Sequence, residues 1–561
     1  MAQPVEPPSP ADSAELRRAF PDLTAAQRAR LGAFGTEAEI AVGGFVFRAG
    51  DTSIDLVVID EGVVEIVRPA TQDAPEEVIV RHGPGRFLGE MSMLTGQTLY
   101  LSGRVVESGR VLRIPPDRFR DLMADDPELS DLLLRAFLAR REMLRSGPAA
   151  RSVEILGSGL SAAALALRTY AARQRLPHLW VDSDTVAGQA LMSAAGVAAD
   201  DLPAVLTPGR ILPRATPGEL AEHLGLSYRR MSDKPVDLVV IGAGPAGLAA
   251  AVYGASEGLT TVLLDSVGTG GQAAASSRIE NYLGFPFGLS GIDLTGRAAV
   301  QALKFGAQIS SPCRAVALET DAEQLRLLLS DGTAIDARSV IVATGARYRS
   351  LPLERWSDFV GAGIYYAATE LEARECDGHP VAVVGGANSA GQAALYLASR
   401  GRSVILVIRG ADVRASMSAY LVERLLADPR VTIRTTTEVS GLAGDTALTE
   451  ITLVDRSTGQ VTGHPCGGLF CFIGADPATD WLTGVAVDED GFVRTDVQLG
   501  PGDLGDTWSS LGRMPLPFET NIPAVFAAGD VRHGSMKRVA AAVGEGASAV
   551  RSVHQAIGLR S

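Results

Sequence analysis

The pattern of hydrophobic and polar positions changes along the chain. Between residues 40 and 114, short alternating segments such as Leu56-Val-Val-Ile-Asp60 are separated by Gly and Asp turns, which is typical of a small β-barrel or jelly roll. Residues 116–145 carry apolar side chains at helical spacing and predict one helix. From residue 236 onward, apolar runs of strand length end in Gly-rich turns and lead into Ala-rich segments, so this part predicts strand–turn–helix units.

A compact α/β pattern lies between these two regions. It predicts strands at 153–156 and 178–182, helices at 161–175, 186–195 and 217–224, and a hairpin at 202–212. Residues 1–15 are rich in Pro, Ser and Ala and predict a disordered tail. Together with the linkers near 146–151 and 232–235, these patterns place domains at 16–147, 150–228 and from 235 onward.

Composition and charge narrow the class of protein. A chain of 561 residues with 46% hydrophobic and 21% charged residues is a soluble globular type, with about three to five domains. No apolar run reaches the roughly 18 residues of a spanning helix, and the N-terminus lacks the pattern of a signal peptide. We therefore expect a cytoplasmic protein without a membrane partner. The net charge of −14 disfavours a nucleic-acid-binding surface.

Four cysteines are present, and none forms a Cys-x-x-Cys pair. They are Cys313, Cys376, Cys466 and Cys471. So few cysteines fit a reducing compartment without structural disulfides. The Cys-x4-Cys pair at the end of this set crosses a predicted strand and is interpreted as packing.

The segment from Val236 to Ala250 carries the strongest chemical signal. An apolar strand ends at Gly242, and Gly244 and Gly247 follow before an Ala-rich helix. These glycines allow a tight turn, a close approach to a pyrophosphate and tight helix–strand packing. Asp265 ends the next strand about 20 residues on, where a ribose-binding acid belongs. A Gly-rich turn without a nucleotide is the alternative, which this context disfavours.

A second turn of the same kind begins at Gly385. Its pattern is Gly385-x-Ala387-x-x-Ala390, so a methyl group replaces the hydrogen that approaches the pyrophosphate. The following strand ends in Arg409 rather than an acid, and Arg414 comes soon after. An arginine here accommodates a 2′-phosphate, which favours NADPH over NADH. The alternative is a pair of surface arginines beside a site that no longer binds.

From 236 to 556 the chain resembles the low-molecular-weight thioredoxin reductase family of flavoproteins with two dinucleotide-binding domains. Besides the two turns, the resemblance rests on the segments 270–272, 279–286, 340–346, 524–530 and 537–547. It implies FAD and NADPH as cofactors and a homodimer. It also implies an FAD-binding domain over 235–350 and 479–556, with the NADPH-binding domain inserted over 351–478.

The resemblance carries over to individual positions. Candidate FAD-binding residues are Gly242, Gly244, Pro245, Ala246, Gly247, Asp265, Gly271, Gln272, Asn281, Thr344, Gly345, Gly529, Asp530, Lys537, Arg538 and Val539. Candidate NADPH-binding residues are Gly385, Gly386, Asn388, Ser389, Ala390, Arg409 and Arg414. No metal site is expected.

The chain departs from this family at the redox-active dithiol. The lead-in Gly361-Ala-Gly-Ile-Tyr-Tyr366 fits, but the four dithiol positions read Ala367-Ala-Thr-Glu370. Because dithiol–disulfide exchange needs an attacking and a resolving thiolate, the family's route to disulfide reduction is closed. No catalytic side chain is therefore predicted at Ala367 or Glu370.

The first domain resembles the cyclic-nucleotide-binding domain family. The resemblance rests on the segments 47–51, 56–62 and 85–96, in which Gly89 and Glu90 match the family's phosphate-binding cassette and are the candidate cyclic-nucleotide ligands. The family's arginine for the cyclic phosphate is missing, since 97–102 reads Gln-Thr-Leu-Tyr-Leu-Ser and Arg104 is expected on the next strand. Burying a phosphate without that partner is costly, so a degenerate sensor domain that packs or dimerises is the alternative.

The second domain resembles the thioredoxin or glutaredoxin fold, with Pro203 at the place of its cis-proline. The loop that carries the dithiol in that family reads Gly157-Ser-Gly-Leu-Ser161. Dithiol chemistry is excluded here because no thiolate is present. A docking or spacer role is expected.

The predicted fold class is multidomain α/β: two Rossmann-like three-layer domains, one inserted in the other, after a barrel and a thioredoxin-like domain. The predicted function is transfer of electrons from NADPH to FAD and on to a non-dithiol acceptor such as oxygen, a quinone, a small molecule or a partner protein. The alternative is a redox or ligand sensor without turnover, in which the N-terminal domain regulates or transmits. Disulfide reduction remains only if cysteines pair in space.

Overall fold

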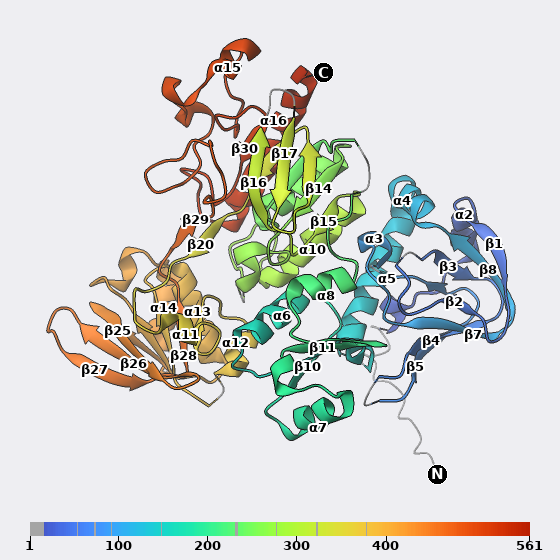
Figure 1. Cartoon of the computed structure of the whole chain (residues 1–561), viewed down its shortest axis with the longest axis horizontal. Helices are drawn as coiled ribbons and strands as arrows, with labels where there is room; N and C mark the ends of the chain where they lie inside the picture. The colour runs from blue at the N-terminus through green and yellow to red at the C-terminus, as the bar shows by residue number, and fades with distance from the viewer. Residues whose placement is uncertain are drawn as a thin grey trace. The chain divides into compact units, whose positions relative to one another are not determined.

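The computed structural model describes residues 16–560 except 53, 72–73, 91, 147, 231–233, 277, 321–323 and 377. The predicted disordered tail over 1–15 lies outside the described residues. The chain divides into two compact units, which are described separately. The first unit contains the chain up to Ser158 together with 166–227 and 303–306, and the second contains the rest. Element labels follow Figure 1.

Two four-stranded antiparallel sheets form the N-terminal barrel (Figure 1, blue). The first has the order β1-β8-β3-β6, with β1 Thr36–Ile40, β8 Gly109–Ile114, β3 Leu56–Ile59 and β6 Phe87–Leu88. The second has the order β2-β7-β4-β5, with β2 Phe45–Phe47, β7 Ser102–Glu107, β4 Val63–Arg68 and β5 Glu77–His82. The predicted β-rich domain is confirmed, and Arg104 lies on β7 as expected.

Helices flank this barrel in sequence. They are α2 (Ala25–Gly32), the short α3 (Ser92–Thr95), α4 (Pro116–Asp125) and α5 (Pro127–Ser146). The single helix predicted over 116–145 is wrong, because the chain breaks at Asp126, whose φ and ψ are −125° and 89°. A proline disfavours helical geometry in the residue before it, and Pro127 then begins α5.

The second α/β domain has one four-stranded sheet in the order β10-β9-β11-β12. Its strands are β9 (Glu154–Gly157), β10 (Leu179–Asp182), β11 (Ala204–Thr207) and β12 (Arg210–Leu212), and its helices are α6 (Ala162–Arg173), α7 (Val186–Ala195) and α8 (Pro217–His223). β9 and β10 are parallel, whereas β11 runs antiparallel to β9. The Leu202–Pro203 peptide is cis. The predicted strands and helices are confirmed to within a few residues.

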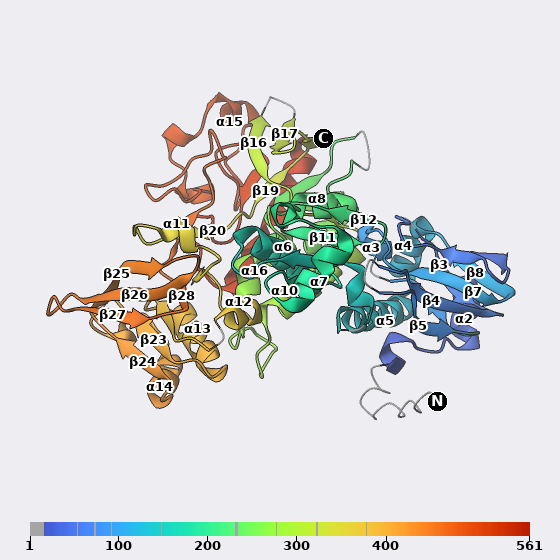
Figure 2. The same cartoon turned by 60° about the horizontal axis from the view of Figure 1, so that its bottom comes forward.

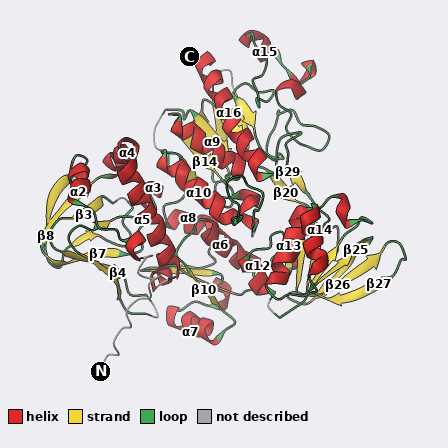
Figure 3. Cartoon of the chain, turned by 180° about the vertical axis from the view of Figure 1, so that it is seen from behind, coloured by secondary structure: helices red, strands yellow, loops and turns green. Residues whose placement is uncertain are grey.

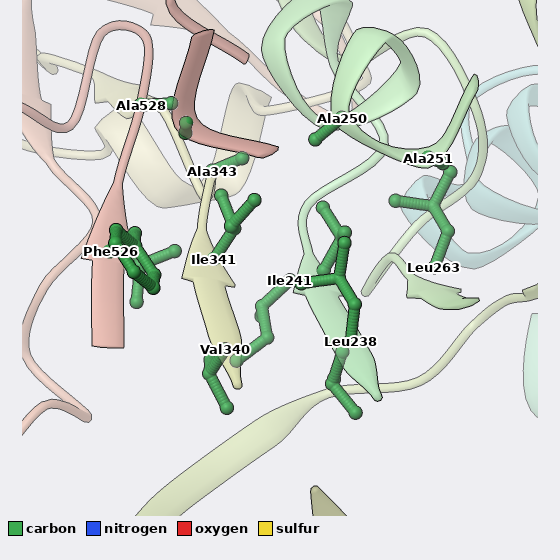
Figure 4. Packing of buried hydrophobic residues seen from close by; sticks show 14 of the residues in the cluster. Leu238, Ile241, Ala250, Ala251, Leu263, Val340, Ile341, Ala343, Phe526 and Ala528 are labelled. Carbon is green, nitrogen blue, oxygen red and sulfur yellow. The ribbon is translucent and has the colours of Figure 1, made fainter. Parts of the chain in front are cut away.

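A five-stranded parallel sheet forms the core of the region from residue 236 onward, in the order β15-β14-β13-β19-β30. Its strands are β13 (Leu238–Ile241), β14 (Thr261–Leu264), β15 (Gln308–Ser310), β19 (Val340–Val342) and β30 (Val525–Ala527). The helices α9 (Pro245–Ser256), α10 (Gly291–Lys304) and α16 (Val539–Arg560) belong to this part, as does the antiparallel sheet β16 (Ala315–Thr320), β17 (Leu325–Leu329) and β18 (Ala334–Ala337). Figure 4 shows Leu238, Ile241, Val340 and Phe526 packed between neighbouring strands.

The inserted domain repeats the same architecture around the parallel sheet β21-β28-β22-β23-β24. Its strands are β21 (Ile364–Tyr365), β22 (Val381–Val384), β23 (Val404–Val407), β24 (Val431–Arg434) and β28 (Gly468–Cys471). Figures 2 and 3 show α13 (Asn388–Ser399) and α14 (Ala419–Ala427) on one side of this domain, and the antiparallel strands β25 (Thr437–Gly444), β26 (Leu448–Asp455) and β27 (Val461–Pro465) on the other.

The insertion is visible in the connections between the two sheets. The chain leaves the first Rossmann-like domain through β20 (Ala346–Tyr348) and returns through β29 (Ala475–Pro477), and these two strands pair antiparallel. The prediction of one nucleotide-binding domain inserted in another is confirmed. No helix among the described residues is long and apolar enough to cross a membrane.

Candidate functional site

The turn between β13 and α9 depends on glycine at two positions. Gly242 has a φ of +106°, and a Cβ atom built on it would lie 2.3 Å from the carbonyl oxygen of Ala343. A Cβ atom on Gly247 would lie only 1.8 Å from the carbonyl oxygen of Gly242. Neither separation is tolerated by a real side chain, so these glycines hold the helix directly against the strand end.

The third glycine of this turn leaves open space. Gly244 is the N-cap of α9 and gives no side-chain cap hydrogen bond, and the nearest heavy atom to a Cβ built on it is 3.9 Å away. Pro245 begins the helix and has no N–H of its own to satisfy. The N–H groups that follow, from Ala246 onward, therefore face a space with the positive end of the helix dipole behind them, which suits a phosphate group.

The C-terminal motif lies against the first turn of α9. Gly529 follows β30 with a φ of +78°, and a Cβ atom on it would lie 2.8 Å from the Cβ of Ala246. A Cβ atom on Gly546 of α16 would lie 2.0 Å from the carbonyl oxygen of Ala246. Two motifs nearly 300 residues apart in sequence are thus brought together by glycine contacts.

Asp530 directly follows this contact. Burial raises the pKa of its carboxyl group, the Lys537 ammonium opposes that shift, and Glu545 adds to it. A partly buried carboxylate needs hydrogen-bond donors, and the hydroxyl groups of a ribitol chain are donors of the required type. As an acceptor for such hydroxyl groups, the Asp530 carboxylate therefore fits the predicted role.

Glu545 on α16 organises the same turn and is not among the residues that the sequence predicted. Its Oε2 accepts a hydrogen bond from the Gly529 backbone N–H at 2.7 Å. Its Oε1 pairs with Arg532 at 2.9 Å and accepts from the Ser535 hydroxyl at 2.8 Å. An acid in an otherwise small and apolar stretch of helix, 540–547, is the signal in the sequence that points to this role.

Asp265 holds the loop after β14. Its Oδ1 accepts from the backbone N–H groups of Val267 and Gly268 at 2.8 and 2.9 Å, and its Oδ2 accepts from Ala243 at 2.8 Å. Since each carboxylate oxygen has two lone pairs, Oδ2 keeps the capacity for one more donor. The carboxylate thus fixes the glycine turn and retains one acceptor for a ribose hydroxyl.

The remaining predicted FAD residues are distributed around these turns. A Cβ atom on Gly271, whose φ is +53°, would lie 2.8 Å from the Cα of Gly244. The Gln272 amide donates to the Ala346 carbonyl, and the Thr344 hydroxyl donates to the Ala478 carbonyl at 3.0 Å, where the inserted domain begins and ends. The other members are the exposed Asn281, the turn residue Gly345, the exposed Lys537 and Arg538, and Val539 at the start of α16.

The second nucleotide turn lies between β22 and α13. Gly385 has a φ of +143°, and a Cβ atom on it would lie 2.3 Å from the carbonyl oxygen of Phe472. Ala387 is the N-cap of α13, with its methyl group exposed and no side-chain cap. Ala390 is fully buried, so here the helix starts far enough from the strand to accept a methyl group.

Polar groups of this second turn hold the next helix in place. The Asn388 side-chain oxygen accepts from the Ser418 backbone N–H at 2.7 Å, at the N-cap of α14. The Ser416 hydroxyl donates to the Gly386 carbonyl at 2.9 Å. Asn388 therefore has a positioning role in this structure, and the exposed Ser389 remains available at the helix N-terminus.

Two arginines follow the carboxyl end of β23. Arg409 and Arg414 are both exposed, and neither guanidinium forms a salt bridge with another described residue. Most other arginines of this unit are paired with acids, for example Arg349 with Asp476 at 2.8 Å. Two unpaired cations beside the ribose end of a dinucleotide turn suit a 2′-phosphate.

The dithiol positions form an ordinary helix start. Thr369 precedes α12 (Glu370–Glu375), and its backbone N–H donates to Glu372 at 3.0 Å. Glu370 pairs with Arg400 at 2.5 Å and with Arg374 at 3.2 Å. The carboxylate at the second dithiol position is thus held by two guanidinium groups, and Ala367 at the first has only a methyl group.

All four cysteines are free and buried. Burial raises the pKa of the Cys313 thiol to about 11 and those of Cys376, Cys466 and Cys471 to about 12. A thiol attacks a disulfide only as the thiolate, so these side chains are unreactive near neutral pH. The interpretation of Cys466 and Cys471 as packing residues agrees with their burial.

The barrel keeps the glycine and acid of the phosphate cassette but not the arginine. Gly89 has a φ of +150°, and Glu90 follows it, with a pKa that burial raises. Arg104 on β7 is occupied by the buried Glu65, with which it forms a salt bridge of 2.5 Å. The nearest arginine after the cassette is therefore committed elsewhere.

Comparison with known proteins agrees with this division. Residues 236–546 match the family Pyridine nucleotide-disulphide oxidoreductase, and residues 38–126 match Cyclic nucleotide-binding domain. The chain is 31% identical over 322 residues to a thioredoxin reductase of Treponema pallidum, covering 56% of this chain and 95% of that protein. It is 32% identical over 320 residues to one of Streptomyces clavuligerus, covering 56% and 91%.

Solved structures show the same likeness. Thioredoxin reductase from Lactococcus lactis superposes with a TM-score of 0.51 at 27% identity, over 58% of this chain and 99% of that one. The T. acidophilum thioredoxin reductase gives the same values. With the intact FAD and NADPH turns, these matches show that the chain belongs to the pyridine nucleotide-disulphide oxidoreductase family, as a thioredoxin reductase-like protein that uses FAD and NADPH and carries a cyclic nucleotide-binding domain before it.

Proposed function

We propose that the protein transfers electrons from NADPH through FAD to an acceptor other than a dithiol of its own. The observation that carries this proposal is the contrast between the two nucleotide turns and the dithiol positions. The turns keep every glycine that sterics demand, whereas the dithiol positions hold Ala367 and an ion-paired Glu370. The acceptor is an external molecule: oxygen, a quinone, a small oxidised metabolite or a partner protein.

The chain's residues have distinct roles in this proposal. The first turn of α9 binds the pyrophosphate of FAD through its backbone N–H groups, and Asp265 and Asp530 accept from ribose and ribitol hydroxyls. When bound, FAD supplies two-electron redox chemistry: it can be reduced by NADPH and reoxidised by the acceptor. Glu545 and Arg532 keep the Gly529–Asp530 turn in position.

The inserted domain binds NADPH in the same way. Gly385 and the N-terminus of α13 receive the pyrophosphate, and Arg409 and Arg414 pair with the 2′-phosphate. The exposed methyl group of Ala387 points to solvent, so the dinucleotide shifts slightly away from the turn. We assign the domains to 235–350 with 479–556 for FAD and 351–478 for NADPH, and we expect a homodimer.

We also propose a thioredoxin-like fold for residues 150–228. The strand order β10-β9-β11-β12, with parallel β9 and β10 and antiparallel β11, supports it, as does the sequence of helices between those strands. No cysteine lies in this range. The domain therefore acts in docking or spacing rather than in thiol exchange.

Anaerobic titration with NADPH tests the proposal. One equivalent of NADPH per FAD is expected to bleach the flavin absorbance, and oxygen or a quinone is expected to restore it. Purified protein whose bound FAD is not reduced by NADPH would contradict the proposal. An acceptor screen on the reduced protein then identifies the class of oxidant.

Cysteine variants test separately whether the protein reduces disulfides through its own thiols. A small aromatic disulfide is expected to be reduced at the same low rate by the wild type, by Cys376→Ser and by Cys313→Ser, because these thiols are buried. A rate that disappears only in Cys376→Ser would show a functional cysteine in the NADPH domain and would overturn this assignment.

A sensor without turnover is the second candidate. It is favoured by the barrel, which retains a ligand-sized cavity while its phosphate arginine is missing. In that case FAD is reduced once by NADPH, but no acceptor supports repeated cycles. Sustained NADPH oxidation with any acceptor of the screen favours the enzyme instead.

A further inference from the structure

The barrel contains a partly open cavity of about 270 Å³ beside the phosphate cassette. Strands β4 and β5, helix α5 and the segment Leu99–Leu101 contribute to its wall, and Gly89 and Glu90 lie on it. Of the nineteen lining residues, fourteen are aliphatic residues, phenylalanine, methionine or proline. An apolar wall of this kind is unsuited to a ribose and a charged phosphate.

The cation on this wall is already occupied. Arg140 of α5 donates from Nε to the Ala19 carbonyl at 2.7 Å, from Nη1 to the Gly89 carbonyl at 2.7 Å and from Nη2 to the Phe87 carbonyl at 3.0 Å. Its guanidinium carbon also lies 4.3 Å from the centroid of the Phe87 ring and 5.1 Å from that of Phe20. Three of the five N–H groups of this guanidinium are thus used to hold the barrel together, and each nitrogen is already bonded to a backbone carbonyl.

Glu90 is the acid on the wall of the cavity. Burial raises its pKa, and the charges of the buried Arg141 and Arg140 oppose that rise. Burial and the neighbouring Arg140 and Arg86 lower the pKa of His82 to about 3, so its imidazole is neutral. An anionic ligand would bring its charge into this apolar cavity next to the carboxyl group of Glu90, where burying a charge is costly, whereas a neutral ligand avoids that cost.

The segment 97–102, where the family resemblance places the cyclic phosphate, packs against the next domain. Tyr100 lines the cavity, and its side chain also belongs to the hydrophobic core of the following α/β domain, with Val153 and Leu212. Its hydroxyl group is hydrogen-bonded to the Gln97 amide, whose oxygen accepts from Arg141 at 3.0 Å. Arg141 also donates to the Arg175 carbonyl at 3.0 Å. The segment is therefore built into the interior of this unit.

We propose that this cavity binds a neutral, largely apolar small molecule of one or two rings, with Glu90 as its polar partner, in place of a cyclic nucleotide. An apolar cavity of about 150 Å³ already holds benzene, so the larger volume here suits a molecule of that type with additional atoms. Because Tyr100 belongs to both the cavity wall and the next domain's core, the bound molecule contacts the element that joins the two domains.

Fluorescence titration of the full-length, FAD-loaded protein with prodan, a neutral naphthalene probe with two fused rings, tests this proposal. Saturable binding of one probe per chain is expected, with no displacement by cyclic AMP or cyclic GMP. Val80→Trp fills the cavity from β5, opposite Ile66, and is expected to weaken probe binding at least tenfold. Val78→Trp on the same strand is the matched control, because Val78 is 43% exposed and does not line the cavity.

Flavin reduction by NADPH in both variants reports on the reductase body, which is the region matched by the family over residues 236–546. Failure of this proposal is therefore distinguishable from failure of the proposed function. Wild-type protein photolabelled with benzophenone gives a second measurement that needs no variant. The label is expected on peptides of β4, β5 and α5. Cyclic AMP that binds by calorimetry and displaces the probe, equal probe affinity in both tryptophan variants, or labelling only outside the barrel would each overturn the proposal.

Discussion

The reductase body and the N-terminal barrel both leave space where a nucleotide would bind, but they differ in the groups that line that space. In the body, Gly242 and Gly247 are retained where a single methyl group would collide with backbone oxygen, and the space beside Gly244 stays open. In the barrel, the space also stays open, but hydrocarbon side chains line it and Arg140 is committed to carbonyl groups.

The difference separates two requirements of a binding site. Room for a ligand is a matter of backbone conformation and small residues, and both regions have it. Recognition of a phosphate additionally needs uncommitted donors, and among these two sites only the body keeps them, at the N-terminus of α9. Shape alone therefore does not indicate the ligand.

Gly247→Ala is expected to give the largest effect in the body. The added methyl would lie 1.8 Å from the Gly242 carbonyl oxygen, so helix and strand must separate. Loss of more than about 3 kcal/mol of stability and of bound FAD is expected. Absorbance of the purified protein and its thermal unfolding measure this. The reverse change in the second turn, Ala390→Gly, is the control and is expected to cost at most about 1 kcal/mol.

Glu545→Gln is expected to have the next largest effect. It leaves Arg532 without its carboxylate partner and weakens the bond to the Gly529 N–H. Because both side chains are largely buried, a loss of roughly 3 kcal/mol is expected, together with weaker FAD retention. Dialysis against buffer followed by flavin quantitation provides the measurement. Unchanged FAD retention would show that the turn does not need this acid.

Arg409→Ala and Arg414→Ala test whether the second turn, like the first, keeps groups that bind a phosphate. Each removes an exposed cation that has no salt-bridge partner among the described residues. The KM for NADPH is expected to rise roughly tenfold to a hundredfold, with the KM for NADH unchanged. Steady-state kinetics with both dinucleotides decides this. An equal rise for NADH would indicate general disruption of the turn instead of a lost phosphate contact.

A pH series tests the neutral wall of the barrel. The pKa of His82 is lowered from 6.5 to about 3 in the folded protein, so the unfolded chain binds the extra proton between those values. The stabilisation is complete above pH 6.5 and falls by about 1.4 kcal/mol per pH unit as the pH drops toward 3. Hydrogen exchange of β4 in the wild type and in His82→Phe, compared at each pH, isolates this contribution. A difference that does not grow with acidity would show that His82 is charged in the fold.

Much of the architecture could be predicted because its signals are local. Strand–turn–helix units such as β13–α9 and β22–α13 follow from short apolar runs and glycine spacing, and the barrel follows from alternation. The break between α4 and α5 was not predicted. Helical periodicity continues through residues 116–145, and it outweighed the effect of Pro127 on the residue before it, Asp126. The missing sulfurs at 367 and 370 are visible from the sequence alone.

The sequence by itself determined which chemical groups are present and which are absent: the turn glycines, the dithiol positions without sulfur, and the cassette without arginine. Only the tertiary structure decided how the remaining polar groups are used. Arg140 donates to a carbonyl 121 residues away, and Glu545 joins a turn 16 residues before it. The reason is physical. Turn conformation and helix or strand periodicity depend on residues close in sequence and leave a pattern there, whereas hydrogen-bond partners and cavity walls arise only when distant elements pack together.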